Sequence, residues 1–192
     1  ARQQLHAQHV AALMSKKLGR PVNLSYTREE DLYSVVRHGS DVDLRIGVSK
    51  DGKLKLFDTT FRLNGGPFTT HTPTVVAAAA RKLQYNVPNY FFEGLSVYTN
   101  HVIGGAFRGY GNSQLTFGRE ILMDRLAEKL GMDPIDFRLL NHVQVGECFP
   151  CASIPVSSNG IEECARRCRA IQAEIDAKEP LVDNEDIRQA WG

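Results

Sequence analysis

The sequence lacks an excess of charge of either sign. Its 23 lysines and arginines face 22 acidic residues, a formal net charge of +1, which gives no electrostatic reason to bind nucleic acid or an anionic membrane. No apolar run approaches the ~20 residues that cross a bilayer, and the first residues are too polar for a secretory signal. We therefore expect a cytoplasmic protein that binds neither nucleic acid nor membrane.

Cysteine is scarce, and all four cysteines fall in the last quarter of the chain, at Cys148, Cys151, Cys164 and Cys168. Without a secretory signal, free thiols are the expectation. The spacing C-x2-C-x12-C-x3-C could instead hold zinc or an iron–sulfur cluster, although the second pair lies in a helical pattern that also explains it. The histidines are scattered; His6 and His9 alone share a helical face, without a partner carboxylate. We predict no metal site formed by side chains.

Position 1 lacks a methionine, and helical periodicity begins almost at once, so we expect a chain cut from something larger. Apolar residues at helical spacing predict a first helix, ended by Gly19 and Pro21: Ala7, Ala11, Met14 and Leu18. Residues 21–26 read as a short strand, and residues 27–40 as a connection with one possible helical turn.

The middle of the chain changes to strand periodicity. Apolar residues alternate with polar ones over 42–48, and Asp51-Gly52 supplies a hairpin turn. The return strand runs to about residue 64, and its switch of apolar parity between Leu56 and Phe57 predicts a bulge. A short helix over 74–85 and a strand over 90–100 follow.

The second half is mainly helical. Helices are predicted over 114–130, ended by Gly131, then from the N-cap Asp133 onward, and over 157–176. Together these elements predict an α+β fold in which an antiparallel hairpin is covered by helices. One domain is expected over residues 1–175, followed by a polar tail or arm over 176–192.

The stretch GGAFRGYGNSQ, residues 104–114, joins a predicted strand to a helix. Its glycines would let the backbone approach a ligand closely, and loop amides before a helix favour anions. Arg108 would add positive charge, while Phe107 and Tyr110 offer flat apolar surfaces to a planar ligand. The alternative is a tight turn whose aromatic side chains enter the core. No Walker A lysine, G-x-S-x-G or H-E-x-x-H pattern is present.

The run from Gly104 to Asn141 closely resembles the molybdenum-cofactor subunit of the xanthine dehydrogenase / aldehyde oxidase family. That family has an A-F-R-G-[FY]-G-x-x-Q loop, then D-x-[IL]-A-x-x-L-G and D-P-x-x-x-R-x-x-N, and this chain has all three, over 106–114, 124–131 and 133–141. Weaker matches upstream and downstream extend the resemblance over about residues 1–175.

The resemblance implies a molybdopterin-binding domain and a place for the cofactor. Gly105, Ala106, Phe107 and Arg108 match the part of the loop that approaches the molybdenum ligands and the pterin, with or without a cytosine dinucleotide tail. Tyr110 matches the aromatic residue that faces the substrate. It further implies iron–sulfur ([2Fe–2S]) and FAD subunits or domains, the remainder of the molybdenum subunit, and a small-molecule substrate.

Other parts of the family pattern are missing. Nothing matches the G-x-G-E segment with the base glutamate, so no catalytic residue is expected in this chain, which alone should be inactive. Where purine-hydroxylating members have an arginine, this chain has Val76. We therefore expect a fragment of a molybdenum-dependent oxidoreductase that hydroxylates an N-heterocycle or an aldehyde with water as oxygen source. The alternative is a non-catalytic binding or assembly module of the same fold.

Overall fold

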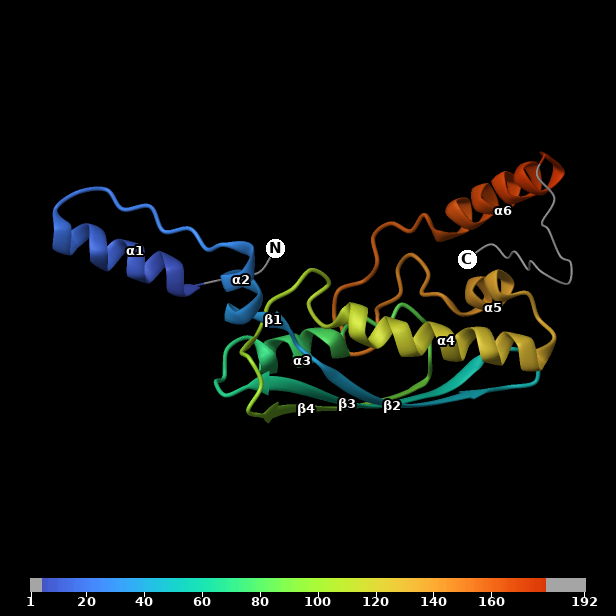
Figure 1. The fold of residues 1–192 in the computed structure, drawn as a ribbon. Coiled ribbons are helices and arrows are strands. Elements are labelled where there is room, and N and C mark those ends of the chain that lie inside the picture. Colours follow the sequence, from blue (N-terminus) through green and yellow to red (C-terminus); the bar gives the residue numbers. More distant parts are fainter. Residues whose placement is uncertain (1–4, 179–192) are drawn as a thin grey trace, which may run out of the picture.

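The computed structural model describes residues 5–178, and the side chains of residues 7–178. Its elements are, in chain order, α1 (Leu5–Leu18), α2 (Arg28–Ser34), β1 (Val36–Arg37), β2 (Ser40–Val48), β3 (Leu54–Gly66), α3 (Thr72–Ala80), β4 (Asn89–Tyr98), β5 (Gly104–Gly105), α4 (Asn112–Leu130), α5 (Pro134–Asn141) and α6 (Ile161–Lys178). Figure 1 shows α3 and α4 along one face of the sheet formed by β2, β3 and β4. The predicted α+β class is confirmed.

The predicted hairpin is present, with its bulge displaced. β2 and β3 pair antiparallel, and the turn is closed by the bonds Ser49 N–H to Lys53 O and Gly52 N–H to Ser49 O, each 2.9 Å. The partners move from Gly47↔Leu56 to Val48↔Leu54. Lys55 therefore has no partner on β2, so the bulge lies just before the position predicted between Leu56 and Phe57.

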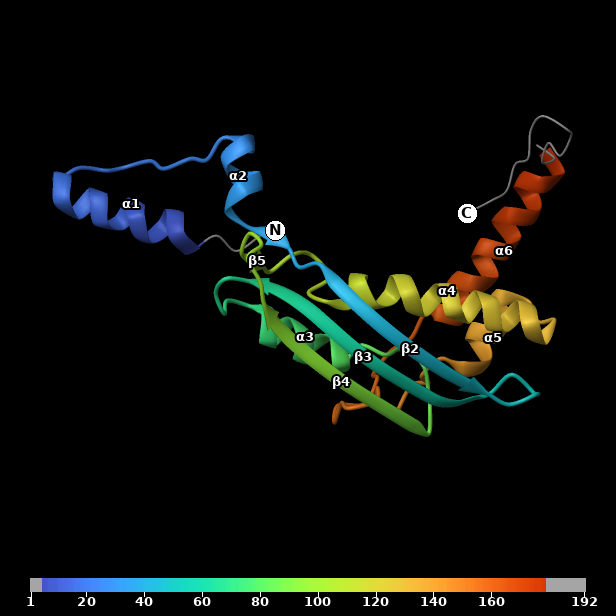
Figure 2. The same cartoon turned by 60° about the horizontal axis from the view of Figure 1, so that its bottom comes forward.

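The third strand joins the sheet in a direction that the sequence did not reveal. β4 pairs with β3 in parallel, so the sheet has the order β2-β3-β4 and is mixed. α3 connects the two parallel strands, because a chain that returns to the same end of a sheet needs a crossover. Figure 2 shows the three strands side by side with α3 behind them. Within this sheet, only the hairpin strands β2 and β3 are antiparallel.

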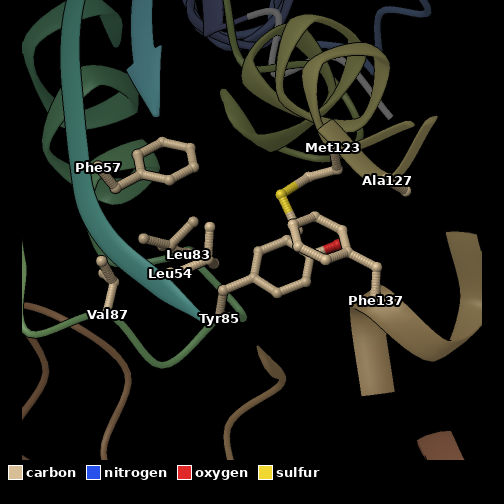
Figure 3. Packing of buried hydrophobic residues seen from close by; sticks show 8 residues of the cluster. All are labelled: Leu54, Phe57, Leu83, Tyr85, Val87, Met123, Ala127 and Phe137. Carbon is tan, nitrogen blue, oxygen red and sulfur yellow. The ribbon is translucent and has the colours of Figure 1, made fainter. Parts of the chain in front are cut away.

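One core cluster lies between the hairpin end, α4 and α5 (Figure 3). Its members are Leu54, Phe57, Leu83, Tyr85, Val87, Met123, Ala127 and Phe137. A second cluster lies between α3, α4 and the other end of the sheet, formed by Phe61, Leu63, Val75, Val76, Ala79 and Leu115. The face of α4 that is buried carries Leu115, Arg119, Met123 and Ala127. Leu122, Leu126 and Leu130 of the same helix are only partly buried.

The described part of the chain before β1 contains two helices, α1 and α2, and no strand. α2 is the expected helical turn, and a capping box between Thr27 and Glu30 begins it. The short strand over 21–26 is wrong, because these residues have no regular structure and no neighbouring strand to pair with. α1 is a helix, but four of its large apolar side chains, including Leu13, are exposed and it projects away from the sheet (Figure 1).

The end of the chain is only partly described. The last predicted helix is α6, and Asp133 caps α5 as expected, since its Oδ1 accepts from two backbone N–H groups of the first turn. The predicted tail begins inside α6, to which residues 176–178 belong. Residues 179–192 lie outside the described residues, as does the side chain of His6.

Candidate functional site

The glycine-rich loop is a fixed turn between β5 and α4. Backbone N–H groups of Tyr110 and Asn112 donate to the carbonyl oxygens of Phe107 and Gly109 at 2.9 and 3.0 Å. Three consecutive residues have left-handed backbone angles, with φ of 94° at Gly109, 47° at Tyr110 and 89° at Gly111. Glycine adopts such angles freely, whereas tyrosine does so only at a conformational cost. The loop therefore has a defined shape despite its composition.

Side chains at both ends of α3 hold this loop. Thr70 Oγ1 donates to Gly104 O at 2.5 Å, and Lys82 Nζ donates to Gly109 O at 3.0 Å. Sequence reasoning missed these residues, as it missed His71. They lie 27 to 39 positions from their partners in the loop, and no local pattern signals such contacts.

Three of the loop glycines leave no room for a side chain, because the chain's own atoms fill the space. A Cβ would lie 1.9 Å from His38 Nδ1 at Gly104, 2.3 Å from Val35 Cγ1 at Gly105 and 2.8 Å from Val75 O at Gly111. These glycines therefore allow close packing inside the chain, and the approach of their backbone to a ligand, which the sequence predicted, stays a prediction. A contact between Gly105 and a cofactor stays a prediction, and the backbone would have to make it.

The segment after Gly105 contains polar groups without partners among residues 5–178. Ala106 is buried, while the Phe107 side chain is 39% exposed and lies under the guanidinium of Arg37, 5.9 Å from its ring centroid. Arg108 is exposed and has no hydrogen-bond or ion-pair partner among residues 5–178. Within the same part of the chain, the backbone N–H groups of residues 106–109 also donate to no acceptor. A free guanidinium and unpaired amides together suit an anionic or oxygen-rich ligand.

The sequence left open whether Tyr110 faces a ligand or enters the core. It is only partly buried, yet it packs against the second core cluster. Its hydroxyl lies 2.9 Å from His71 Nδ1, and either group can be the donor. The substrate-facing role of Tyr110 stays a prediction.

Val76 lies in the core, in the cluster against which Tyr110 packs. It is 8% exposed, and a Cβ placed on Gly94 would come within 2.2 Å of its Cγ1. The side chain thus faces β4. Position 76 offers no polar group to a substrate.

His38 is a buried polar residue directly behind Gly104. Its Nδ1 lies 2.8 Å from Asn64 O, and since a carbonyl only accepts, Nδ1 carries the hydrogen. Nε2 is then a buried acceptor without a partner among the described residues. Burial lowers the pKa of His38. A cavity of about 310 Å³ adjoins it, lined by residues that include Arg37, His101 and Gly104.

A second cavity, of about 280 Å³, contains an ion-pair network. Glu120 accepts from Tyr85 Oη at 2.7 Å, Arg119 Nε at 2.9 Å and Arg138 Nε at 3.0 Å. Arg138 also donates to Asp124 Oδ1 at 2.7 Å. Burial, followed by the charge of Glu120, raises the pKa of Tyr85. Asp124 and Arg138 belong to the motifs that mark the family, and here they join α4 to α5.

The four cysteines are exposed and free. Among residues 5–178, no group of three or more His, Cys, Asp or Glu side chains is placed to hold a metal ion. The structure therefore does not bring the four thiols together as the zinc or cluster alternative requires. No described helix is long and apolar enough to span a membrane.

The sequence profile of the molybdopterin cofactor-binding domain family matches residues 2–142. The chain is 34% identical, over 166 residues, to the xanthine dehydrogenase molybdenum-binding subunit of Escherichia coli O157:H7, covering 84% of this chain and 22% of that protein. It is 33% identical, over 174 residues, to the nicotinate dehydrogenase large molybdopterin subunit of Eubacterium barkeri, covering 89% and 41%. This chain belongs to the molybdopterin cofactor-binding domain family, within the xanthine dehydrogenase / aldehyde oxidase group, as the motifs predict.

Solved structures of related enzymes superpose on this chain. The aldehyde oxidoreductase of Desulfovibrio gigas superposes with a TM-score of 0.80 at 31% identity, covering 92% of this chain and 20% of that one. Quinoline 2-oxidoreductase of Pseudomonas putida 86 gives 0.69 at 25% identity, covering 88% and 24%. The chain thus spans about a fifth to a quarter of these enzymes.

Proposed function

We propose that this chain is the part of a molybdenum hydroxylase that presents the loop of residues 104–114 to a molybdopterin cofactor. The observation that carries the proposal is the free Arg108 guanidinium beside the unpaired amides of residues 106–109. These groups sit on a loop that is bonded to Thr70 and Lys82, on either side of α3. A preformed set of donors binds an anionic group without first reorganising.

The donors fit the proposed cofactor. Molybdopterin carries phosphate and dithiolene groups, and the guanidinium and amide donors here are suited to such acceptors. When bound, the cofactor supplies the two-electron oxidation in which water provides the oxygen atom. Arg108 would bind it, Ala106 and Phe107 would pack against it, and Phe107 is itself held by the cation–π contact with Arg37. Residues beyond this loop would determine whether the cofactor is molybdopterin alone or molybdopterin with a cytosine dinucleotide tail.

An N-heterocycle or an aldehyde is the proposed substrate. Relatives named for nicotinate and quinoline act on N-heterocycles, and another is named for aldehydes. Purines are disfavoured because the position where an arginine is expected is the buried Val76. Tyr110 would meet the substrate with the part of its ring that the core leaves open. The proposed partners are iron–sulfur and FAD subunits or domains and the remainder of the molybdenum subunit. The proposed location is cytoplasmic.

Tyr110 also supports a second candidate, a non-catalytic binding or assembly module. Its ring packs against the second core cluster and its hydroxyl is bonded to His71, so it could serve the fold alone. In that case the loop would hold no redox cofactor. The two candidates therefore differ in molybdenum content.

The test is molybdenum and pterin content of the full-length protein with Arg108→Ala. We expect cofactor content to fall about tenfold, since one or two charge-assisted bonds of about 1.5 kcal/mol or more are lost. Arg125→Ala, an exposed arginine on α4, is the matched control and should retain the cofactor. Equal cofactor content in both variants would refute the role of Arg108, and a wild-type protein without molybdenum would favour the second candidate. The 192-residue chain alone should hold less than one equivalent.

A further inference from the structure

The side chain of His71 is turned away from the helix that it begins. His71 is the N-cap residue of α3, but its side chain makes no capping bond. Its Nδ1 instead lies 2.9 Å from the Tyr110 hydroxyl, and the two rings meet edge to face at 80° with centroids 6.0 Å apart. The imidazole therefore joins the start of α3 to the glycine-rich loop.

Tyr110 is strained where this contact is made. Among residues 5–178, only Tyr110 and Cys151 have a positive φ without being glycine. A residue with a Cβ keeps such a backbone angle only where its surroundings hold it there. The bonds from Thr70 and Lys82 restrain the loop at Gly104 and Gly109, and the side chain of Tyr110 adds a restraint at the strained residue itself. Its ring contacts the second core cluster, and its hydroxyl contacts His71.

We propose that His71 is the positioning residue for Tyr110, and that the Nδ1–hydroxyl hydrogen bond holds the left-handed turn through which the loop presents its aromatic ring. His71 acts through Tyr110 and does not itself contact a ligand. Because the hydroxyl is engaged, Tyr110 offers a ring surface in one fixed orientation, which suits a planar heteroaromatic substrate. This consequence for the substrate rests on the function proposed above, whereas the hold on the loop does not.

Hydrogen–deuterium exchange of the peptide spanning residues 105–115 tests the hold directly in the full-length protein. Tyr110→Phe removes only the hydroxyl, and His71→Leu removes its partner. Each change should speed exchange of the Tyr110 and Asn112 amides about five- to tenfold, the effect of losing one hydrogen bond. The double variant should exchange no faster than either single variant, because all three lack the same bond. Tyr33→Phe, which deletes an exposed hydroxyl on α2, is the matched control and should leave this peptide unchanged.

A conservative variant and kinetics separate positioning from general destabilisation. His71→Asn provides an amide that can again bond the hydroxyl, and it should restore part of the protection. In the molybdenum-loaded protein, Tyr110→Phe and His71→Leu should raise KM for a planar N-heterocycle by a similar factor while kcat and molybdenum content change less. Multiplying effects in the double variant, or unchanged exchange in Tyr110→Phe, would overturn the proposal. If the wild-type protein has no turnover, the proposed function fails, and the exchange data still decide the role of His71.

Discussion

Gly104→Ala should be strongly destabilising although it adds only one methyl group. The new Cβ would lie 1.9 Å from His38 Nδ1, 2.3 Å from His38 Cε1 and 3.0 Å from Asn64 O. The ring cannot simply move aside, since His38 is 3% exposed and bonded through Nδ1 to that same carbonyl oxygen. Either the imidazole is displaced from Asn64, or β5 separates from β1.

Both outcomes cost free energy that can be bracketed. Overpacking a filled core costs about 1–3 kcal/mol, and a buried polar group that loses its partner costs about 1–3 kcal/mol more. We therefore expect the free energy of unfolding to fall by about 2–6 kcal/mol. With a urea m-value of about 2 kcal/mol/M, the unfolding midpoint would fall by roughly 1–3 M. Circular dichroism of the purified chain in urea measures this shift.

Gly160→Ala is the matched control for this experiment. Gly160 has no heavy atom within 4 Å of its Cβ position, and its φ is not left-handed. The same added methyl should therefore leave the midpoint unchanged or raise it slightly. If Gly104→Ala unfolds within ~0.5 kcal/mol of wild type, the size of an ordinary surface substitution, the assignment of Gly104 to internal packing is refuted.

Two further predictions concern buried polar groups. Asn141→Ala should lower the free energy of unfolding by about 2–4 kcal/mol, because its buried amide accepts from Leu54 N–H and donates to Gly52 O, both at 2.8 Å; Asn100→Ala, at an exposed position, should have little effect in the same urea titration. Burial lowers the pKa of His38, so the unfolded chain takes up a proton there at a higher pH than the folded chain, and stability is lost as the pH falls below about 6.5. Tm should therefore fall further between about pH 7.5 and about pH 5.5 in wild type than in His38→Gln, and equal falls would contradict this origin.

Sequence patterns correctly predicted those turns and helix ends that depend only on neighbouring residues. The Asp51-Gly52 turn, the Asp133 cap and the Gly131 end of α4 each depend on neighbouring residues, and each is present. The short strand predicted over 21–26 fails because strand propensity without a pairing partner forms no sheet. The parallel direction of β4 was equally out of reach, since it depends on where α3 returns the chain.

The sequence by itself determined the family and the loop that characterises it. The A-F-R-G-Y-G run and the motifs that follow consist of residues close together in the chain, so they can be recognised without knowledge of the fold. It also determined that Arg108 is the charged group of that loop. It did not determine what the glycines are for.

Only the tertiary structure decided that question. Gly104, Gly105 and Gly111 make room for the residues on either side of β1 and for α3, and the loop contacts Thr70, His71 and Lys82. These partners are distant in the chain, and steric exclusion acts only between atoms that folding brings together. The loop is therefore recognisable in the sequence, whereas the contacts that give it a shape exist only in the fold.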